Sequence, residues 1–203
     1  YSQKGKWHRR RSPRNVIDEL MIAKKQKYRL VHFNDDSFIS NPEWLNEFAS
    51  LYKEHIDMPF QINACPEHIT EEAARTLSKI RCLKVKIGVQ TISDRLKRDI
   101  CRRFENVARI PSALDYLKRN GIYAAIDVMY NLPTQTEAEI IEDLKFYNAI
   151  RPSEIIPFNL IYFPETSIVN IALQYGLLNG RDIEKIKNGG LVADYIKDQK
   201  LLC

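Results

Sequence analysis

Hydrophobic runs alternate along the chain with polar residues and helix-like segments. Five runs are apolar enough to be strands, and each precedes polar side chains and a segment of helical character: 28–33, 59–62, 83–89, 122–126 and 154–163. Runs of this kind are typical of buried parallel strands. The repeated strand–helix units predict an α/β fold, a βα barrel whose working face lies at the carboxyl ends of its strands.

Capping side chains mark where the helices between these runs should begin. Their oxygens can accept hydrogen bonds from the free N–H groups of a first turn: Ser12, Ser40 or Asn41, Thr70 and Thr136. Gly121 should end the helix over 112–120, since glycine tolerates a positive φ. Pro111 predicts either a kink in that helix or its start.

Two later segments also have helical spacing. Residues 143–150, DLKFYNAI, form an amphipathic pattern. We expect Leu144 and Tyr147 to face the core there. Residues 176–190 predict a further helix with glycines at its ends.

Length and composition fit a single α/β domain. The chain has 203 residues, 44% of them hydrophobic, and no linker or repeat divides it. No apolar run approaches the roughly 20 residues that span a bilayer, and nothing at the start resembles a secretion signal, which predicts a soluble, cytoplasmic protein. The four cysteines lack any CxxC pair, so they predict neither a zinc site nor a disulfide framework: Cys65, Cys82, Cys101 and Cys203.

The net charge of +5 comes from the first segment. Six basic residues stand within the first 14 positions, which leaves the remainder at about −1. In a nucleic-acid-binding protein, KWHRRR would contact phosphates and Trp7 would stack on a base. No second basic stripe follows, so the pattern favours an anionic group of a cofactor or substrate over nucleic acid.

The order of elements at the start predicts a missing strand. The helix expected over 15–25 is followed at once by the strand over 28–33. A barrel-type sheet has a strand ahead of such a helix, and without it an apolar edge would be exposed, a state that folded proteins avoid. We therefore expect the chain to be a piece of a longer protein.

A series of motifs resembles the radical S-adenosylmethionine (radical SAM) enzymes. The motifs are RRRSPRNVIDEL, FNDDSF, NACPEHIT, IGVQTISDRLKRDICRR, IDVMYNLPTQTE and IIPFNLIYFPET, and they cover nearly the whole chain. The resemblance depends on their order and spacing: Gln90 follows IGV, Arg102 follows a helix, and Asp127 precedes NLPTQTE. The RSPRNVIDEL helix and the acidic pair look most like the cobalamin-binding branch.

The resemblance implies a partial (βα) barrel, a mostly parallel sheet with outer helices, formed by residues 1–203 as one radical SAM core domain. Such enzymes hold a [4Fe-4S] cluster through three thiolates of a CxxxCxxC loop, which leaves one iron open for S-adenosylmethionine. No CxxxCxxC stands in this chain. Tyr1 and Ser2 resemble the residues that follow the third cysteine, so we expect the cluster ligands upstream of Tyr1 and no metal ligand within the chain.

The resemblance also assigns the cofactor-binding residues of the first strands. Asn34, Asp35 and Asp36 fall where the methionine amino group is received, and amide and carboxylate oxygens can accept from an ammonium. Asn63 matches the end of the third strand of the family, where relatives often have Glu. Gln90 resembles the residue that faces the ribose or methionine part.

Three further residues complete the implied site. Arg102 looks like the arginine that pairs with the methionine carboxylate, a task that suits its planar donor fork. Asp127 resembles the acid that accepts from the ribose hydroxyls. Ile161 occupies the backbone position beside the adenine.

Each assignment has a structural alternative. Gln90 and Asn63 could be strand-end groups bonded to neighbouring backbone. Arg102 could form an ion pair with Asp99 or Glu105 on a helix surface. The acidic pair could cap the next helix, or suggest a divalent ion, although two acids make a poor Mg²⁺ or Ca²⁺ cage.

The resemblance implies reductive cleavage of S-adenosylmethionine to a 5′-deoxyadenosyl radical, for a methyl transfer or a rearrangement on a small-molecule, natural-product-like or peptide substrate. It further implies an electron donor such as flavodoxin or ferredoxin, and allows a cobalamin-binding domain upstream. Two alternatives stay open: a cluster-free barrel that acts as a binding or scaffold protein, and an ordinary βα-barrel enzyme that uses Asp127 as acid or base.

Overall fold

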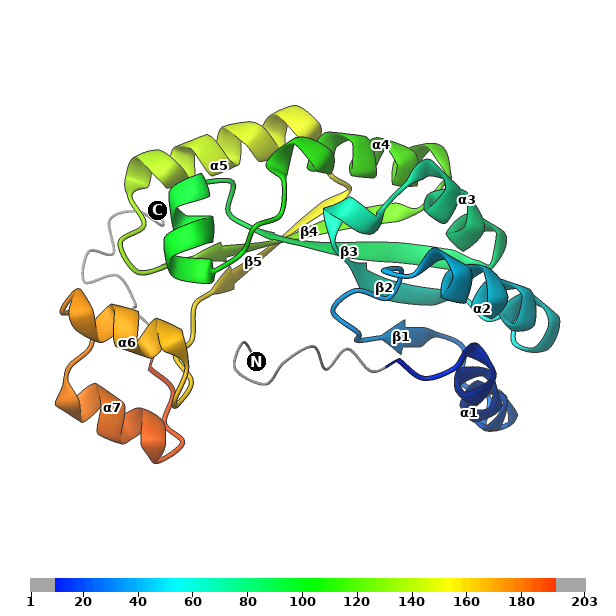
Figure 1. Cartoon of the computed structure of the whole chain (residues 1–203), viewed down its shortest axis with the longest axis horizontal. Helices are drawn as coiled ribbons and strands as arrows, with labels where there is room; N and C mark the ends of the chain where they lie inside the picture. The colour runs from blue at the N-terminus through cyan, green and yellow to red at the C-terminus, as the bar shows by residue number, and fades with distance from the viewer. Residues whose placement is uncertain (1–9, 193–203) are drawn as a thin grey trace. The chain divides into compact units, whose positions relative to one another are not determined.

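The computed structural model describes residues 10–192, and its helices and strands are drawn in Figure 1. Five strands form one sheet in the order β1-β2-β3-β4-β5. β1 and β2 run parallel, as do β4 and β5. The strands are β1 Val31–Phe33, β2 Phe60–Ala64, β3 Cys82–Gln90, β4 Tyr123–Tyr130 and β5 Glu154–Asn159. Helices follow the strands, so the predicted α/β class is confirmed.

Seven α-helices and three short helical turns accompany the strands within residues 10–192. The helices are α1 Pro13–Lys25, α2 Pro42–His55, α3 Glu71–Lys79, α4 Ile110–Arg119, α5 Glu137–Ile150, α6 Ser167–Gln174 and α7 Gly180–Lys187. The turns are η1 Pro66–His68, η2 Leu96–Cys101 and η3 Val107–Arg109. None of these helices has both the length and the apolar character needed to cross a lipid bilayer. The predictions for Tyr1, Ser2, Trp7 and Cys203 concern residues outside the described range.

The predicted caps are confirmed. Ser12 and Thr70 cap α1 and α3, and Asn41, rather than Ser40, caps α2. Thr136 forms a capping box with Glu139 at the start of α5, where each side chain accepts from the backbone of the other. α4 begins at Ile110, so Pro111 stands in its first turn, where a missing N–H costs nothing, and causes no kink.

Several strand boundaries differ from the prediction. β1 has three residues instead of six, and Tyr28 and Leu30 ahead of it are 61% and 50% exposed. β5 ends at Asn159, four residues earlier than expected, and contains Pro157, which has no N–H to donate to a sheet. β4 continues three residues beyond Asp127. The apolar runs therefore locate the strands but not their ends.

The described residues divide into two compact units. One contains the chain up to Lys86 together with Asp115–Tyr123, and the other contains Ile87–Leu114 and the chain from Ala124. In the first unit α1 packs on α2, and α2 on α3 (Figure 1). Its core holds an aromatic cluster in which Phe33 and Phe38 lie 4.6 Å apart, and Phe48 stacks on Trp44 at 5.0 Å between ring centroids.

The second unit has a core of its own around η2, α6 and α7. Figure 1 shows α6 and α7 side by side after β5. Leu96 and Ile100 of η2 pack with Val169 and Ala172 of α6 and Ile186 of α7. The helix expected within 176–190 is therefore present as α7, and it buries Ile186.

The core-facing residues of α5 are partly different from the predicted ones. Tyr147 is 1% exposed, as expected, but Leu144 is 49% exposed and Asp143, one position earlier, is 1% exposed. The prediction for Leu144 is wrong because the buried carboxylate of Asp143, which has hydrogen-bond partners of its own, takes the core position on this turn of the helix.

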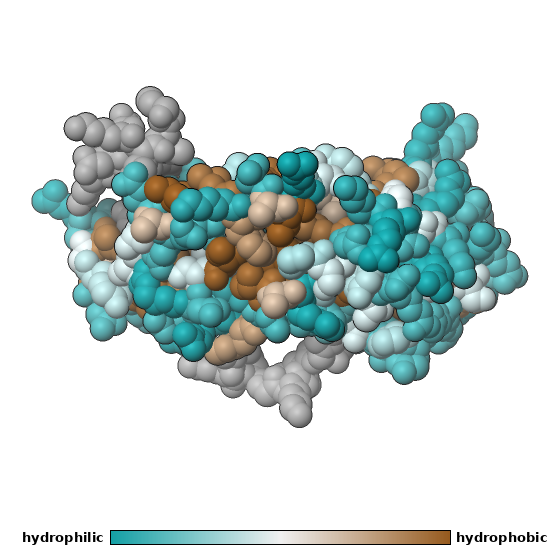
Figure 2. Space-filling model, turned by 90° about the horizontal axis from the view of Figure 1, so that it is seen from above, coloured by the Kyte–Doolittle hydropathy of each residue, from teal (hydrophilic) through white to brown (hydrophobic). Residues whose placement is uncertain are grey.

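Figure 2 shows an apolar area within a mostly polar face of the molecule.

Candidate functional site

The loop after β1 is tied to the end of β2. Asn34, Asp35 and Asp36 are exposed, and they lead into a turn in which the Phe38 N–H donates to the Asn63 carbonyl at 3.2 Å. The Asn63 Nδ2 donates to the Asp35 carbonyl at 3.4 Å. These four predicted residues are thus brought together within the first unit, and their carboxylate and amide oxygens are acceptors suited to an ammonium.

A second contact and a cavity accompany this loop. Ser37 Oγ lies 2.7 Å from His68 Nδ1 of η1, so the loops after β1 and β2 are joined by side chains as well as backbone. A cavity of about 540 Å³ has Asp35, Asp36 and Arg10 among its lining residues. The acidic pair does not cap the next helix, because Asn41 does.

Gln90 occupies a strained turn at the end of β3. The Thr91 N–H donates to the Val89 carbonyl at 2.8 Å, which closes a three-residue turn around Gln90, and Gln90 has a φ of +64°. A central residue with positive φ makes this the rarer and more strained form of the γ-turn. A side chain other than glycine is kept at such a position only where its surroundings fix it.

The amide of Gln90 is free to accept a hydrogen bond. Its Oε1 is buried and accepts no hydrogen bond from residues 10–192. Its Nε2 would lie 3.3 Å from a Cβ at Gly88, a contact tighter than most, so a side chain at 88 would press on the amide. Gln90 Oε1 is therefore not hydrogen-bonded to neighbouring backbone, so the structural alternative does not hold for this atom.

Arg102 and Arg103 stand in contrast after η2. Arg102 is exposed with a φ of +52°, and its guanidinium makes no ion pair within the described part of the chain, so the alternative pairing with Asp99 or Glu105 is not found. Arg103 instead donates from Nε to Glu105 Oε1 at 2.6 Å and from Nη2 to the Gly88 carbonyl at 3.2 Å. Arg102 is thus the available donor fork of the two.

Asp127 lies within β4, not at its end. Its neighbours Ile126 and Val128 are 0% and 1% exposed, and the Asp127 Cα is paired with that of Ile156 in β5. The side chain itself is half-buried. Ile161 follows β5 and is 37% exposed. With Gln90 and Arg102, these residues belong to the second unit.

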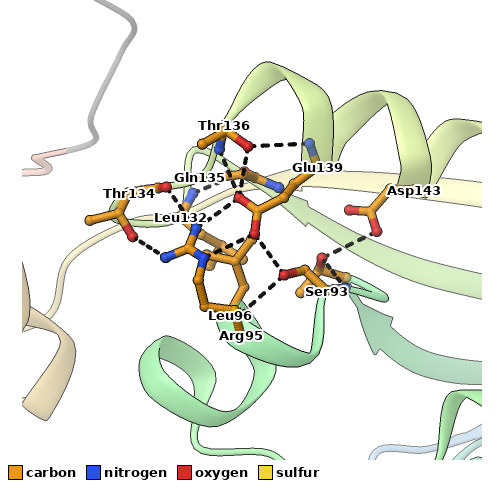
Figure 3. A network of polar contacts seen from close by, with 10 residues as sticks. Ser93, Arg95, Leu96, Leu132, Thr134, Gln135, Thr136, Glu139 and Asp143 are labelled. Atoms are coloured by element: carbon orange, nitrogen blue, oxygen red, sulfur yellow. Dashed lines mark hydrogen bonds and ion pairs between the residues drawn. The ribbon is translucent and has the colours of Figure 1, made fainter.

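A polar network missed by the sequence analysis holds the segment after Gln90 to α5 (Figure 3). Glu139 accepts from Ser93 Oγ at 2.7 Å and from Arg95 Nη2 at 2.8 Å, and Arg95 Nη1 also donates to Thr134 Oγ1 at 2.8 Å. Burial raises the pKa of Glu139, but the hydrogen bonds from Arg95, Ser93 and Thr136 outweigh it and lower the pKa to about 2. The capping box of Thr136 and Glu139 was a visible signal, but the partners from 93–95 were not.

The cysteines do not assemble a metal site within residues 10–192, where no group of three or more His, Cys, Asp or Glu could hold an ion. Cys82 is buried, and burial raises the pKa of its thiol to about 12; burial also raises that of Cys101. Metals bind the thiolate, so these thiols are poor ligands as they stand. The described residues therefore do not fit an iron–sulfur cluster.

Comparison with known sequences gives a family and distant relatives. The sequence model described as "Radical SAM superfamily" matches residues 1–147. The chain is 22% identical over 162 residues to the heme chaperone HemW of Lactococcus lactis subsp. lactis, covering 77% of this chain and 42% of that protein. It is 26% identical over 133 residues to anaerobic coproporphyrinogen III oxidase 1 of Cereibacter sphaeroides, covering 62% and 29%. The chain thus spans less than half the length of these curated relatives.

Solved structures share the fold. The radical S-adenosylmethionine methyltransferase TsrM from Kitasatospora setae, with cobalamin and a [4Fe-4S] cluster bound, aligns with a TM-score of 0.69 at 18% identity, over 81% of this chain and 32% of that one. The coproporphyrinogen III oxidase HemN from Escherichia coli aligns with a TM-score of 0.59 at 17% identity, over 88% and 40%.

Proposed function

Because the chain belongs to the radical SAM superfamily, we propose that it is the part of a larger enzyme that binds S-adenosylmethionine at the carboxyl ends of its strands. When bound together with a reduced [4Fe-4S] cluster, that cofactor supplies a 5′-deoxyadenosyl radical for hydrogen abstraction. The protein's own contribution is to bind, orient and shield the cofactor.

The Gln90 amide is the observation that carries the proposal. A buried acceptor without a donor costs about 1–3 kcal/mol, and a left-handed glutamine adds strain, so a ligand that donates to this amide would offset the cost. Gly88 leaves room beside this amide, where a Cβ would be 3.3 Å from Nε2. The residues present therefore fit a polar ligand with hydroxyl or amino donors, which S-adenosylmethionine carries.

The other residues take complementary roles in the proposal. Arg102 offers its unpaired guanidinium to the methionine carboxylate through a bidentate contact. Asp127 accepts from the ribose hydroxyls, and the backbone at Ile161 lies beside the adenine. In the first unit the acidic loop accepts from the amino group, through Asn34, Asp35 and Asp36. Asn63 supports that loop through the Asp35 carbonyl.

The cluster is assigned to residues outside those described. We propose three cysteines directly ahead of Tyr1, which the coding sequence would show at once. We also propose a cobalamin-binding domain in the whole protein, supported by the fold shared with TsrM, whose structure holds cobalamin. We further propose that the whole protein is a cytoplasmic enzyme that receives electrons from flavodoxin or ferredoxin and acts by methyl transfer or rearrangement.

The substrate class is proposed as a small molecule or a peptide. Among proteins of the same fold, TsrM has been solved with a tryptophan substrate and SuiB from Streptococcus suis with a precursor peptide. Both likenesses are below 20% identity, so they support the fold and leave the substrate to experiment.

The deciding experiment measures cofactor binding and cleavage separately. The full-length protein, reconstituted anaerobically with iron and sulfide, is titrated with S-adenosylmethionine, and 5′-deoxyadenosine is then assayed under reduction. We expect binding that Gln90→Ala weakens at least tenfold, and cleavage that is lost when the upstream cysteines are changed to Ala. A protein that binds no S-adenosylmethionine would refute the proposal and favour the cluster-free scaffold.

A further inference from the structure

Asp143 contacts the residues directly after Gln90 from the opposite element. It lies in α5, 1% exposed, and its Oδ1 accepts from the Ile92 N–H at 2.7 Å and from Thr91 Oγ1 at 3.2 Å. Thr91 is itself fully buried, and its Oγ1 also accepts from the Ser93 N–H at 3.1 Å. One carboxylate oxygen thus fixes the two residues that leave the strained turn.

The strain at Gln90 explains why such a contact is needed. A γ-turn with a positive φ opens readily to extended backbone, in which the side chain would point elsewhere. Thr91 supplies the N–H that closes the turn on the Val89 carbonyl. Holding Thr91 and Ile92 in place therefore holds the Gln90 amide over Gly88.

Glu139 acts one helical turn before Asp143 and secures the rest of the segment. Its contacts to Ser93 and Arg95 place residues 91–95 along one face of α5, since positions four apart on a helix lie on the same side. Glu139 touches Ser93 and Arg95 but not Thr91 or Ile92, so Asp143 alone of the two contacts the turn.

We propose that Asp143 is a positioning residue that holds the Gln90 turn in the conformation that binds S-adenosylmethionine. The inference rests on the proposed function. A buried carboxylate is an expensive way to stabilise a helix, because desolvation opposes its charge. Its two donors belong to Thr91 and Ile92, directly after Gln90, so the buried charge stabilises the turn that carries the Gln90 amide.

The test is a double-mutant cycle in the full-length protein, with S-adenosylmethionine affinity measured by calorimetry without reductant, so that no cleavage occurs. We expect Asp143→Ala to weaken binding about tenfold, the usual effect of removing a hydrogen-bonded charged group. In a Gln90→Ala background the same change should have no further effect, because the residue through which Asp143 acts is gone. A merely structural role would weaken both backgrounds equally.

Two variants serve as controls. Asp143→Asn keeps Oδ1 as the acceptor and replaces Oδ2, which has no hydrogen-bond partner among residues 10–192, so near wild-type affinity is expected. Tyr147→Phe alters the same buried face of α5 without touching the turn and should leave affinity unchanged. If Asp143→Ala does not fold, Thr91→Val, which removes one of the two donors, takes its place in the cycle.

The outcomes separate the two proposals. Additive losses for Asp143→Ala and Gln90→Ala, or a wild-type affinity for Asp143→Ala, would overturn the positioning role while Gln90→Ala still reports on the cofactor site. Absence of any S-adenosylmethionine binding by the wild type would overturn the proposed function itself, and the positioning role with it.

Discussion

Arg102 and Arg103, which follow η2, are neighbours in the sequence but make different contacts. The Arg103 guanidinium is engaged by Glu105 and the Gly88 carbonyl, whereas that of Arg102 is exposed and left-handed in backbone. Two adjacent arginines in a sequence do not show which of them forms an ion pair within the protein and which is left to bind a ligand. Only the pairing separates the structural arginine from the candidate ligand.

Arg102→Lys tests this distinction. The charge is retained but the bidentate geometry is lost, so S-adenosylmethionine affinity should fall about tenfold with little change in thermal stability. The matched variant Arg103→Lys should do the reverse, lowering the melting temperature more than the affinity. Calorimetry and thermal unfolding of the two proteins give the comparison. An unchanged affinity for Arg102→Lys would remove the residue from the site.

Side-chain types at strand ends were predictable at this scale, and their partners were not. Asn34, Asp35 and Gln90 could be selected because polar residues interrupt apolar runs. Asp143 could not, because a carboxylate beside Leu144 in an amphipathic segment reads as solvent-facing. Its burial depends on two donors that stand 52 and 51 residues earlier in the chain, and such long-range pairs leave no local pattern in the sequence.

The Glu139 carboxylate of α5, which can be titrated, joins this helix to the connection between β3 and η2. Glu139 has its pKa lowered from 4.5 to about 2 in the folded protein. A depressed pKa contributes stability that is present above about pH 4.5 and is lost as the pH falls towards 2.

Glu139→Gln should therefore destabilise the protein by about 1–2 kcal/mol at pH 7, a value reduced from the full shift because Arg95 is 44% exposed. The difference from wild type should shrink between about pH 4.5 and 2. Denaturant unfolding at several pH values measures it. A difference that stayed constant across this range would show that the ion pair is not the source.

The helix α2 carries the aromatic core of the first unit. Phe48 is fully buried against Trp44, Tyr52 and Phe60. Phe48→Ala should lower the free energy of unfolding by about 3–5 kcal/mol, because a large cavity forms. Phe104, 81% exposed, provides the matched control, and Phe104→Ala should change it by less than about 0.5 kcal/mol. Similar losses for both would contradict the core assignment.

Element starts were better predicted than element ends. Caps are local chemistry, so Ser12, Thr70 and Thr136 could be recognised from a few residues. The ends of β1 and β5 depend on which neighbouring strand continues, and apolar composition carries no such information. Pro157 within β5 is the one local sign that this strand lacks a donor at that position.

At the scale of the whole molecule, the order of strands and helices was predictable and the family followed from the motif series. Residues 1–147 match the superfamily, which includes every motif up to NLPTQTE. The predicted fragment nature and single-domain organisation remain predictions. The division into two compact units could not be anticipated, because no change in composition accompanies the boundaries near Lys86 and Ala124.

Ligand binding should be visible in the stability of the whole protein. At a hundredfold excess over its dissociation constant, S-adenosylmethionine should stabilise the folded full-length protein by about 2.7 kcal/mol and so raise its melting temperature. Thermal unfolding with and without the cofactor measures the shift. Gln90→Ala should reduce it, whereas Tyr147→Phe should retain it. An equal shift for the two variants would argue against a role for Gln90.

At the left-handed turn of Gln90, folding stability and ligand binding favour different residues. Glycine adopts such a backbone without strain, so Gln90→Gly should stabilise the folded protein by up to about 1 kcal/mol. A laboratory screen for heat resistance would then enrich glycine at position 90 while discarding the amide. Natural selection, if it acts on cofactor binding, would keep the less stable residue.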